Sequence, residues 1–134
     1  MSTTDARNRA GVIRAMFAAI DRAEDADELI RGLLGFLTDD VVFVIGNLDP
    51  LLGKEAVIPT IRESMAALRS IQHEIHHVWQ AAEDPNVLIA QLTTHHTRLD
   101  GVRISLPGCH VLRMRGDLIA ESRAYSDPTP LFAA

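Results

Sequence analysis

Four stretches in the second half of the chain have the composition of β-strands, and short turn sequences separate them. Asp100-Gly101 lies between two of these stretches and is a strong hairpin signal, because both residues tolerate positive φ. In one stretch apolar and polar residues alternate clearly, which is typical of a strand with one buried face. This half therefore predicts a meander of strands over residues 71–82, 87–98, 102–115 and 118–127.

The first half of the chain predicts three helices around one short strand. Apolar residues recur at helical spacing over residues 13–20, 30–37 and 58–68. The middle helix begins at Asp25, with Glu28 three residues later as in a capping box. The β-branched run VVFVI (41–45) predicts a buried strand. Helices followed by a meander indicate an α+β domain, in which the three helices cover one face of the sheet.

Composition sets the class of protein. The 134 residues fit one domain over residues 1–134, and a hydrophobic fraction of 47% suffices for a core. A formal charge of −5 with scattered basic residues argues against a nucleic-acid partner. The chain starts without a secretory signal, and no apolar run approaches the roughly 20 residues of a membrane span. Cys109 has no intrachain partner for a disulfide, which favours a reducing compartment such as the cytoplasm. Without a long apolar run, we expect no membrane partner.

The alternation along residues 102–115 separates an inner from an outer face. If Asp100-Gly101 is a two-residue loop, cross-strand pairing places Gln91, Thr93 and His95 on the inner side. A shift of one residue would reverse all three. The inner face of residues 102–115 itself carries one ionisable group, His110, among Ile104, Leu106, Gly108, Leu112 and Met114.

The orientation of the last strand depends on the turn at residues 115–117. A two-residue loop would bury Glu121 and Arg123, which costs several kcal/mol unless the two charges pair well. We therefore expect a three-residue loop, which turns Glu121, Arg123, Tyr125 and Asp127 outward. The inner residues are then small, which leaves room for a ligand: Ala120, Ser122, Ala124 and Ser126.

The order of these elements resembles the nuclear transport factor 2-like superfamily, and within it the SnoaL-like and ketosteroid isomerase-like branch. The resemblance is carried by MFAAIDRAEDADEL (16–29), LTDDVVFVIG (37–46), GKEAV (53–57) and GDLIAESRAYSD (116–127). It implies a cone-shaped, curved mixed β-sheet, a half-barrel whose three N-terminal helices cover a deep pocket. It also implies a small hydrophobic molecule as ligand and a homodimer formed through the outer face of the sheet.

The catalytic residues of these relatives are not carried over to this chain. The tyrosine of the isomerases falls on Phe17, their base falls near Ile45, and their second oxyanion donor falls on His110. The catalytic residues of the limonene-type epoxide hydrolases are not matched in this chain either. SnoaL-type cyclases use an acidic residue near the end of the last strand, where Asp127 lies, although the expected register turns Asp127 outward.

His110 and His95 are the candidate catalytic residues. An imidazole in an apolar pocket can act as general acid or base near neutral pH. The alternative for His110 is a buried histidine that is hydrogen-bonded to a neighbour. The aromatic candidates for substrate binding could instead belong to the hydrophobic core, and Asn47 could instead be a turn residue. The full set of expected substrate contacts is Asn47, Phe17, Phe43, Trp79, Thr93, Ser122, Ser126 and Asp127.

Residues 73–77 match the zinc motif H-E-x-x-H, which binds the metal when it lies on a helix. One helix through residues 54–82 would be roughly 40 Å long, which exceeds the width of a small domain. In a strand, His73 and His77 would lie about 13 Å apart, too far to share one ion. We therefore expect no metal and no other cofactor.

Three functions follow as hypotheses. The first is a cofactor-free isomerase, cyclase or dehydratase that acts on a hydrophobic substrate by general acid–base chemistry. The second is a ligand-binding domain of the same fold without chemistry. The third and most remote is a zinc hydrolase.

Overall fold

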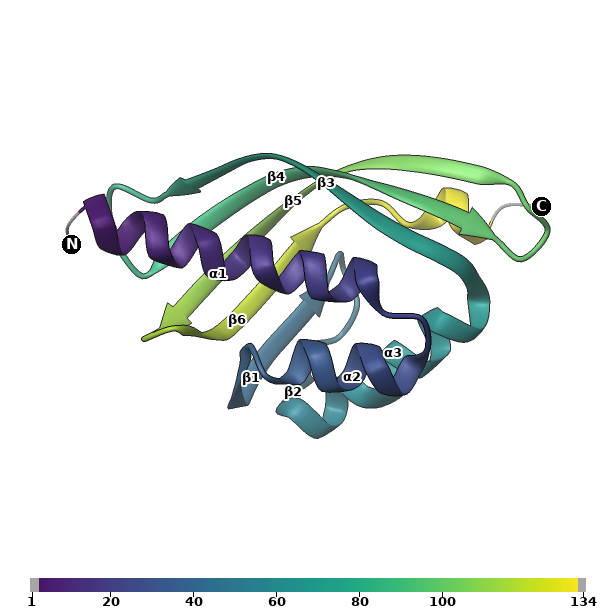
Figure 1. Ribbon diagram of the computed structural model, residues 1–134, viewed down its shortest axis with the longest axis horizontal. Helices are drawn as coiled ribbons and strands as arrows, with labels where there is room; N and C mark the ends of the chain where they lie inside the picture. The colour runs from purple at the N-terminus through teal and green to yellow at the C-terminus, as the bar shows by residue number, and fades with distance from the viewer. Residues whose placement is uncertain (1–2, 133–134) are drawn as a thin grey trace.

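The computed structural model describes residues 3–132 and has three helices on one face of a mixed β-sheet (Figure 1). The helices are α1 (Thr3–Arg22), α2 (Ala26–Leu34) and α3 (Lys54–Ala67). The strands are β1 (Leu37–Ile45), β2 (Leu51–Leu52), β3 (Leu68–Gln80), β4 (Val87–Arg98), β5 (Arg103–Arg115) and β6 (Leu118–Tyr125), and the 3-10 turn η1 (Thr129–Phe132) follows. The expected α+β class is confirmed.

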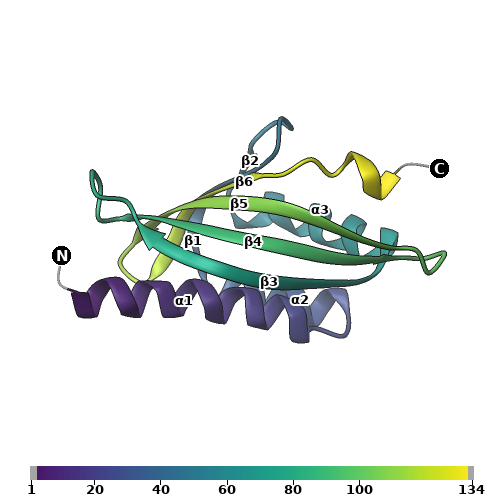
Figure 2. The same cartoon turned by 90° about the horizontal axis from the view of Figure 1, so that it is seen from above.

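The strand order in the sheet is β2-β1-β6-β5-β4-β3. Neighbouring strands are antiparallel except β1 and β6, which run parallel. The long strands bend over the helices, and α1 runs alongside β3 (Figure 2). The sheet therefore has a concave inner face toward the helices and an outer face turned away from them.

The helix ends follow the sequence signals. The Asp25 side chain caps α2 by accepting a hydrogen bond from the Glu28 backbone N–H at 2.8 Å, as the capping box predicts. None of the helices within residues 3–132 combines the length and the apolar content that crossing a membrane requires.

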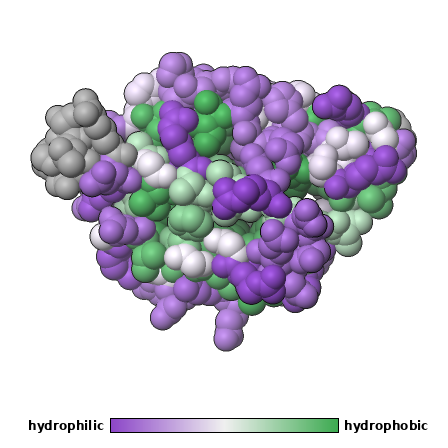
Figure 3. All heavy atoms as spheres, viewed as in Figure 1, coloured by the Kyte–Doolittle hydropathy of each residue, from purple (hydrophilic) through white to green (hydrophobic). Residues whose placement is uncertain are grey.

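The core lies between α1 and the inner face of the sheet. Ile13 and Phe17 on α1 pack in one cluster with Leu92 and Leu112 from the sheet, each at most 2% exposed. Complete burial of one such side chain stabilises the fold by roughly 1.5–3 kcal/mol. In Figure 3, apolar side chains still show between polar ones near the middle of the helix-covered face.

The β4–β5 hairpin differs from the prediction by one residue. Its loop holds three residues, Leu99 to Gly101, and the backbone bond from Arg98 N to Val102 O closes it at 2.8 Å. Gly101 has a φ of 88°, the left-handed conformation of the third position in such loops. Ala90 therefore pairs with His110 in place of Gln91.

The shift of one residue reverses the faces of β4. Leu92, Thr94 and His96 point inward, and His96 is 9% exposed. The prediction that Gln91, Thr93 and His95 line the inner face is wrong. An Asp-Gly pair is compatible with loops of two and of three residues, and the loop length decides the face.

The β5–β6 connection also differs from the prediction, but most residues of β6 still point to the expected face of the sheet. The loop has two residues, since Arg115 pairs with Leu118, so the predicted three-residue loop is wrong. The pairing shifts between Arg113 and Met114, where β6 contains one extra residue. Because of this extra residue, the following residues of β6 point to the faces that a three-residue loop would have given them. Ser122 is therefore buried at 1% exposure, and Ile119 takes the fully buried position expected for Ala120.

Candidate functional site

A histidine–carboxylate pair joins the end of α1 to β3. His73 Nδ1 lies 2.7 Å from Asp21 Oδ1, and the His73 backbone N–H donates to Asp21 Oδ2 at 3.0 Å. Because a carboxylate only accepts, Nδ1 carries the hydrogen and Nε2 of the neutral ring keeps its lone pair. The side chains are 10% and 18% exposed. Asp21 therefore holds the His73 ring in one tautomer and one orientation.

Phe17 links this pair to a second inner histidine. It lies one helical turn before Asp21, so both side chains project from the same side of α1. Its ring centroid is 4.8 Å from that of His73 and 5.2 Å from that of His110, the latter in an edge-on arrangement. The fold thus brings α1, β3 and β5 together around one aromatic ring.

His110 lies on the inner face of β5, as the alternation predicts, and its Nδ1 is buried. This atom has no hydrogen-bond partner among the described residues, and the strand partners Ala90 and Ala124 offer it no polar side chain. Burial, with a smaller effect from His73, lowers the pKa of His110 to about 4. His110 is therefore a neutral imidazole at physiological pH, with a ring nitrogen available to a ligand.

The inner face of the sheet is only half covered. Leu112 and Met114 are fully buried in the core with α1, whereas Ile104, Leu106 and Gly108 on the same face of β5 stay partly accessible. Burial along this face of β5 therefore decreases from Met114 toward Ile104, and His110 lies between the buried and the accessible part. An apolar, partly accessible stretch of the sheet's concave face therefore adjoins the imidazole.

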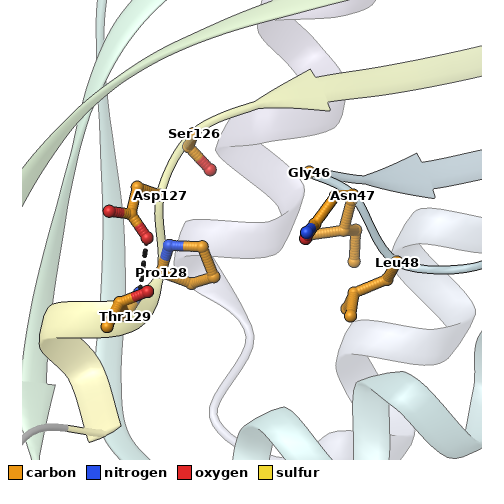
Figure 4. Close-up of a pocket in the computed structure, with 8 residues that line it drawn as sticks. Gly46, Asn47, Leu48, Ser126, Asp127, Pro128 and Thr129 are labelled. Carbon is orange, nitrogen blue, oxygen red and sulfur yellow. Dashed lines mark hydrogen bonds between the residues drawn. The ribbon is translucent and has the colours of Figure 1, made fainter.

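A pocket of about 490 Å³ lies beyond this concavity, between residues 45–48 after β1 and residues 126–129 after β6 (Figure 4). The Ser126 hydroxyl points into the space between these segments. Ser126 packs over Gly108, where an added Cβ would lie 3.6 Å from the Ser126 Cβ. Gly108 precedes His110 by two positions on the same strand face, so one wall of the pocket packs against the strand segment that carries His110.

Three expected binding residues, Asn47, Ser126 and Asp127, line this pocket. The Asp127 carboxylate turns away from the opening and accepts a hydrogen bond from the Thr129 backbone N–H at 3.0 Å (Figure 4). The Thr129 side chain and, to a smaller extent, this backbone bond keep the pKa of Asp127 below its ordinary value. Asp127 is thus exposed and turned outward, in the direction that the sequence predicts.

Two further expected residues, Phe43 and Ser122, lie side by side in the sheet. They are register partners on β1 and β6, and Phe43 packs against the core. Ser122 is 1% exposed, and neither residue lines the pocket between residues 45–48 and 126–129.

Three other expected residues lie on the outer face of the sheet. His95 contacts Glu74 Oε1 at 2.9 Å and Ser105 Oγ at 2.7 Å, and Thr93 contacts His76 Nε2 at 2.8 Å. Trp79 is 49% exposed and stacks on His77. The structure therefore separates His95, Thr93 and Trp79 from the inner histidines.

The H-E-x-x-H sequence lies in β3, so the helical geometry that holds zinc is not formed. Within the part of the chain that the structure describes, no group of three potential ligands gathers around a metal position. The motif is divided between the two faces, since His73 points inward and Glu74 outward.

Sequence reasoning missed Asp21 and His73 as members of the site. A signal for each was present, because Asp21 follows Phe17 by four residues on the inner stripe of α1. His73 alternates with the apolar Ile71 and Ile75. His96 was also missed, because the predicted register turned it outward. It lies on the inner face of β4, where burial lowers its pKa.

Three helices on the concave face of a curved, unclosed, six-stranded mixed sheet define an α+β half-barrel of the nuclear transport factor 2-like type. Residues 13–122 match the model of the SnoaL-like domain family. The protein belongs to this family, and the resemblance noted in the sequence is confirmed.

Solved structures agree with this fold. An NTF2-like protein of unknown function from Burkholderia pseudomallei K96243 is 17% identical at a TM-score of 0.80, with 98% of this chain and 96% of that chain covered. A putative SnoaL-like polyketide cyclase from Jannaschia sp. CCS1 is 11% identical at 0.79, with 98% and 94% covered. TerC, co-crystallised with polyporic acid, is 17% identical at 0.77, with 93% and 95% covered. A search of curated proteins found none that matches.

Proposed function

We propose that this protein is a cofactor-free enzyme that transfers a proton on a hydrophobic small molecule, in an isomerisation, cyclisation or dehydration. The observation that carries the proposal is the Asp21–His73 pair beside His110, with Phe17 between the two rings. A base held by a carboxylate and a second neutral imidazole, both facing an apolar concavity, are the groups that such a reaction needs.

The two imidazoles take different roles in this proposal. His73 Nε2 removes a proton from a substrate carbon next to a carbonyl, and Asp21 stabilises the imidazolium that forms. His110, with its pKa near 4, is a weak base at neutral pH and instead hydrogen-bonds the substrate oxygen. The proton then returns from His73 to another atom of the substrate. His95 has no part in this scheme, because it lies on the outer face.

The substrate enters through the pocket at the ends of β1 and β6. Asn47 and Ser126 offer polar contacts there. Phe43 and Ser122 are paired farther back along the same two strands. The putative polyketide cyclase and the polyporic acid complex among the solved structures support a small organic ligand for this chain as well.

Deuterium exchange tests the proposal without knowledge of the natural substrate. In D₂O, the protein should accelerate incorporation of deuterium at the α-carbon of a cyclic aryl ketone such as 2-tetralone, measured by mass spectrometry. A ketone that binds but exchanges only at the buffer rate would contradict catalysis. It would favour the second hypothesis, a ligand-binding domain, which the neutral and unpaired His110 also supports.

We further propose that residues 1–134 act as one domain, in the cytoplasm, as a homodimer through the outer face of the sheet. This face exposes Trp79 by 49% and Tyr125 by 56%, and exposed aromatic side chains are enriched at protein interfaces.

The double variant Trp79→Lys/Tyr125→Lys should therefore be monomeric, because two cations replace apolar contact area at the proposed interface. Light scattering after size exclusion would show half the wild-type mass, and circular dichroism would show an unchanged fold. A wild-type protein that is itself monomeric at micromolar concentration would contradict the dimer.

A further inference from the structure

Among the residues that the structure describes, the surroundings of His110 hold no lysine or arginine. The described lysine and arginine side chains in ion pairs contact carboxylates on the surface: Asp27, Asp39, Asp40, Asp84, Asp100 and Glu121. Arg14, Arg22, Arg31 and Arg103 are exposed. Arg98 is on the same side of β4 as His96, at the end of the strand, and it pairs with Asp100 at 2.8 Å. Near His110 the described residues therefore offer a permanently charged anion, such as a phosphate, no guanidinium or ammonium partner.

Imidazoles are the groups at this site that can gain a positive charge. His73 on β3, His96 on β4 and His110 on β5 all face inward, and α1 adds one carboxylate, Asp21. Both Asp21 oxygens are engaged by His73. The neighbouring strand β6 presents Ser122 and Ala124 to the same space, neither of which titrates.

His96 and His110 each have a buried Nδ1 without a hydrogen-bond partner among the described residues. Of the two, His110 lies two positions from Gly108, over which the pocket residue Ser126 packs. A buried polar atom without a hydrogen bond is unfavourable, so a ligand oxygen that pairs with Nδ1 removes this penalty. An anionic oxygen gains more, because an ion pair in an apolar site is weakly screened. When an anionic ligand binds, the His110 ring must therefore also gain a proton.

We propose that the ligand of this site is a hydrophobic weak acid, a carboxylic acid or an acidic enol, whose anionic oxygen pairs with His110 while His110 takes up one proton from solvent. The inference rests on the pocket of the proposed function and adds the class of its ligand. No covalent step is involved: the proton joins a ring nitrogen, and the charged N–H donates to the ligand oxygen.

Proton uptake makes the affinity depend on pH with a defined sign. In the empty site burial lowers the pKa of His110 to about 4, and a bound anion raises it. Between these two values the complex holds one proton more than the separate partners. The affinity for the anion therefore falls about tenfold for each unit of rising pH, whereas a neutral ligand needs no proton.

Naphthalene-2-carboxylate and its methyl ester are matched probes for titration calorimetry. We expect the dissociation constant of the acid to rise about tenfold per pH unit between pH 5.5 and 7.5. Buffers of different ionisation enthalpy should report uptake of close to one proton. The ester should bind equally well at each pH. In His110→Leu, the acid should lose its pH dependence, whereas the ester should lose only the hydrogen bond to His110 and should still bind independently of pH.

His95→Leu is the control, because it removes an exposed imidazole from the outer face and should retain the full pH dependence. A dissociation constant for the acid that is constant with pH overturns the inference and leaves the pocket intact. A pH dependence that persists in His110→Leu overturns it as well. Failure of both probes to bind overturns the inference together with the pocket on which the proposed function depends.

Discussion

His73→Gln is expected to lower the rate of deuterium exchange into a bound ketone by about 10²–10⁴-fold, the contribution typical of a positioned acid–base group. Glutamine retains a donor for Asp21 Oδ1, so the carboxylate does not lose its partner, but the amide has no lone pair that accepts a proton from carbon. Ketone affinity should change little, because the Phe17 ring and the concavity remain.

Asp21→Asn provides a second test of the pair. An amide stabilises an imidazolium far less than a carboxylate does, so the exchange rate should fall while the fold persists. His76→Gln is the matched control, because it changes a histidine of the same strand on the outer face. A His73→Gln protein that exchanges at the wild-type rate would show that His73 is not the base.

Acidification is expected to destabilise the protein through His110. The unfolded chain binds a proton at this histidine near pH 6.5, whereas the folded chain binds it only near pH 4. Because the unfolded state holds more protons within this window, the stabilising contribution is complete above about pH 6.5 and is lost as the pH falls toward 4. The expected loss from His110 between pH 7 and 4.5 is about 2 kcal/mol.

Urea unfolding of wild type and His110→Leu at these two pH values measures the effect. The variant should lose about 2 kcal/mol less than wild type on acidification, since leucine does not titrate. Burial also lowers the pKa of His96, which adds to the acid sensitivity of both proteins in the same direction. His77→Gln, on the outer face, should retain the wild-type loss. Equal losses in wild type and His110→Leu would refute the assignment.

Local sequence patterns predicted the helices and strands and the inward position of two residues of the site. Alternation along β5 placed His110 on the inner face, and helical spacing placed Phe17 in the core. These inferences succeed because the periods of strands and helices arise from a few consecutive residues. The capping of α2 by Asp25 is equally local.

The register of β4 was decided by a difference that the sequence left open. A loop of three residues, in place of two, moved His95 and Thr93 outward and His96 inward. On the other side of β5 an irregularity compensated for a two-residue loop, so Ser122 and Ala124 stayed inward. In both hairpins the local signal marked the turn, and the packing of the whole sheet set the pairing.

The sequence by itself determined the α+β class, the family and the inward position of His110, because each depends on local periodicity or on a pattern spread over most of the chain. The tertiary structure alone decided that Asp21 meets His73 across 52 residues and that Phe17 touches both rings. Such contacts depend on how α1 lies across β3 and β5. That placement follows from the packing of many side chains at once, and no short stretch of sequence encodes it.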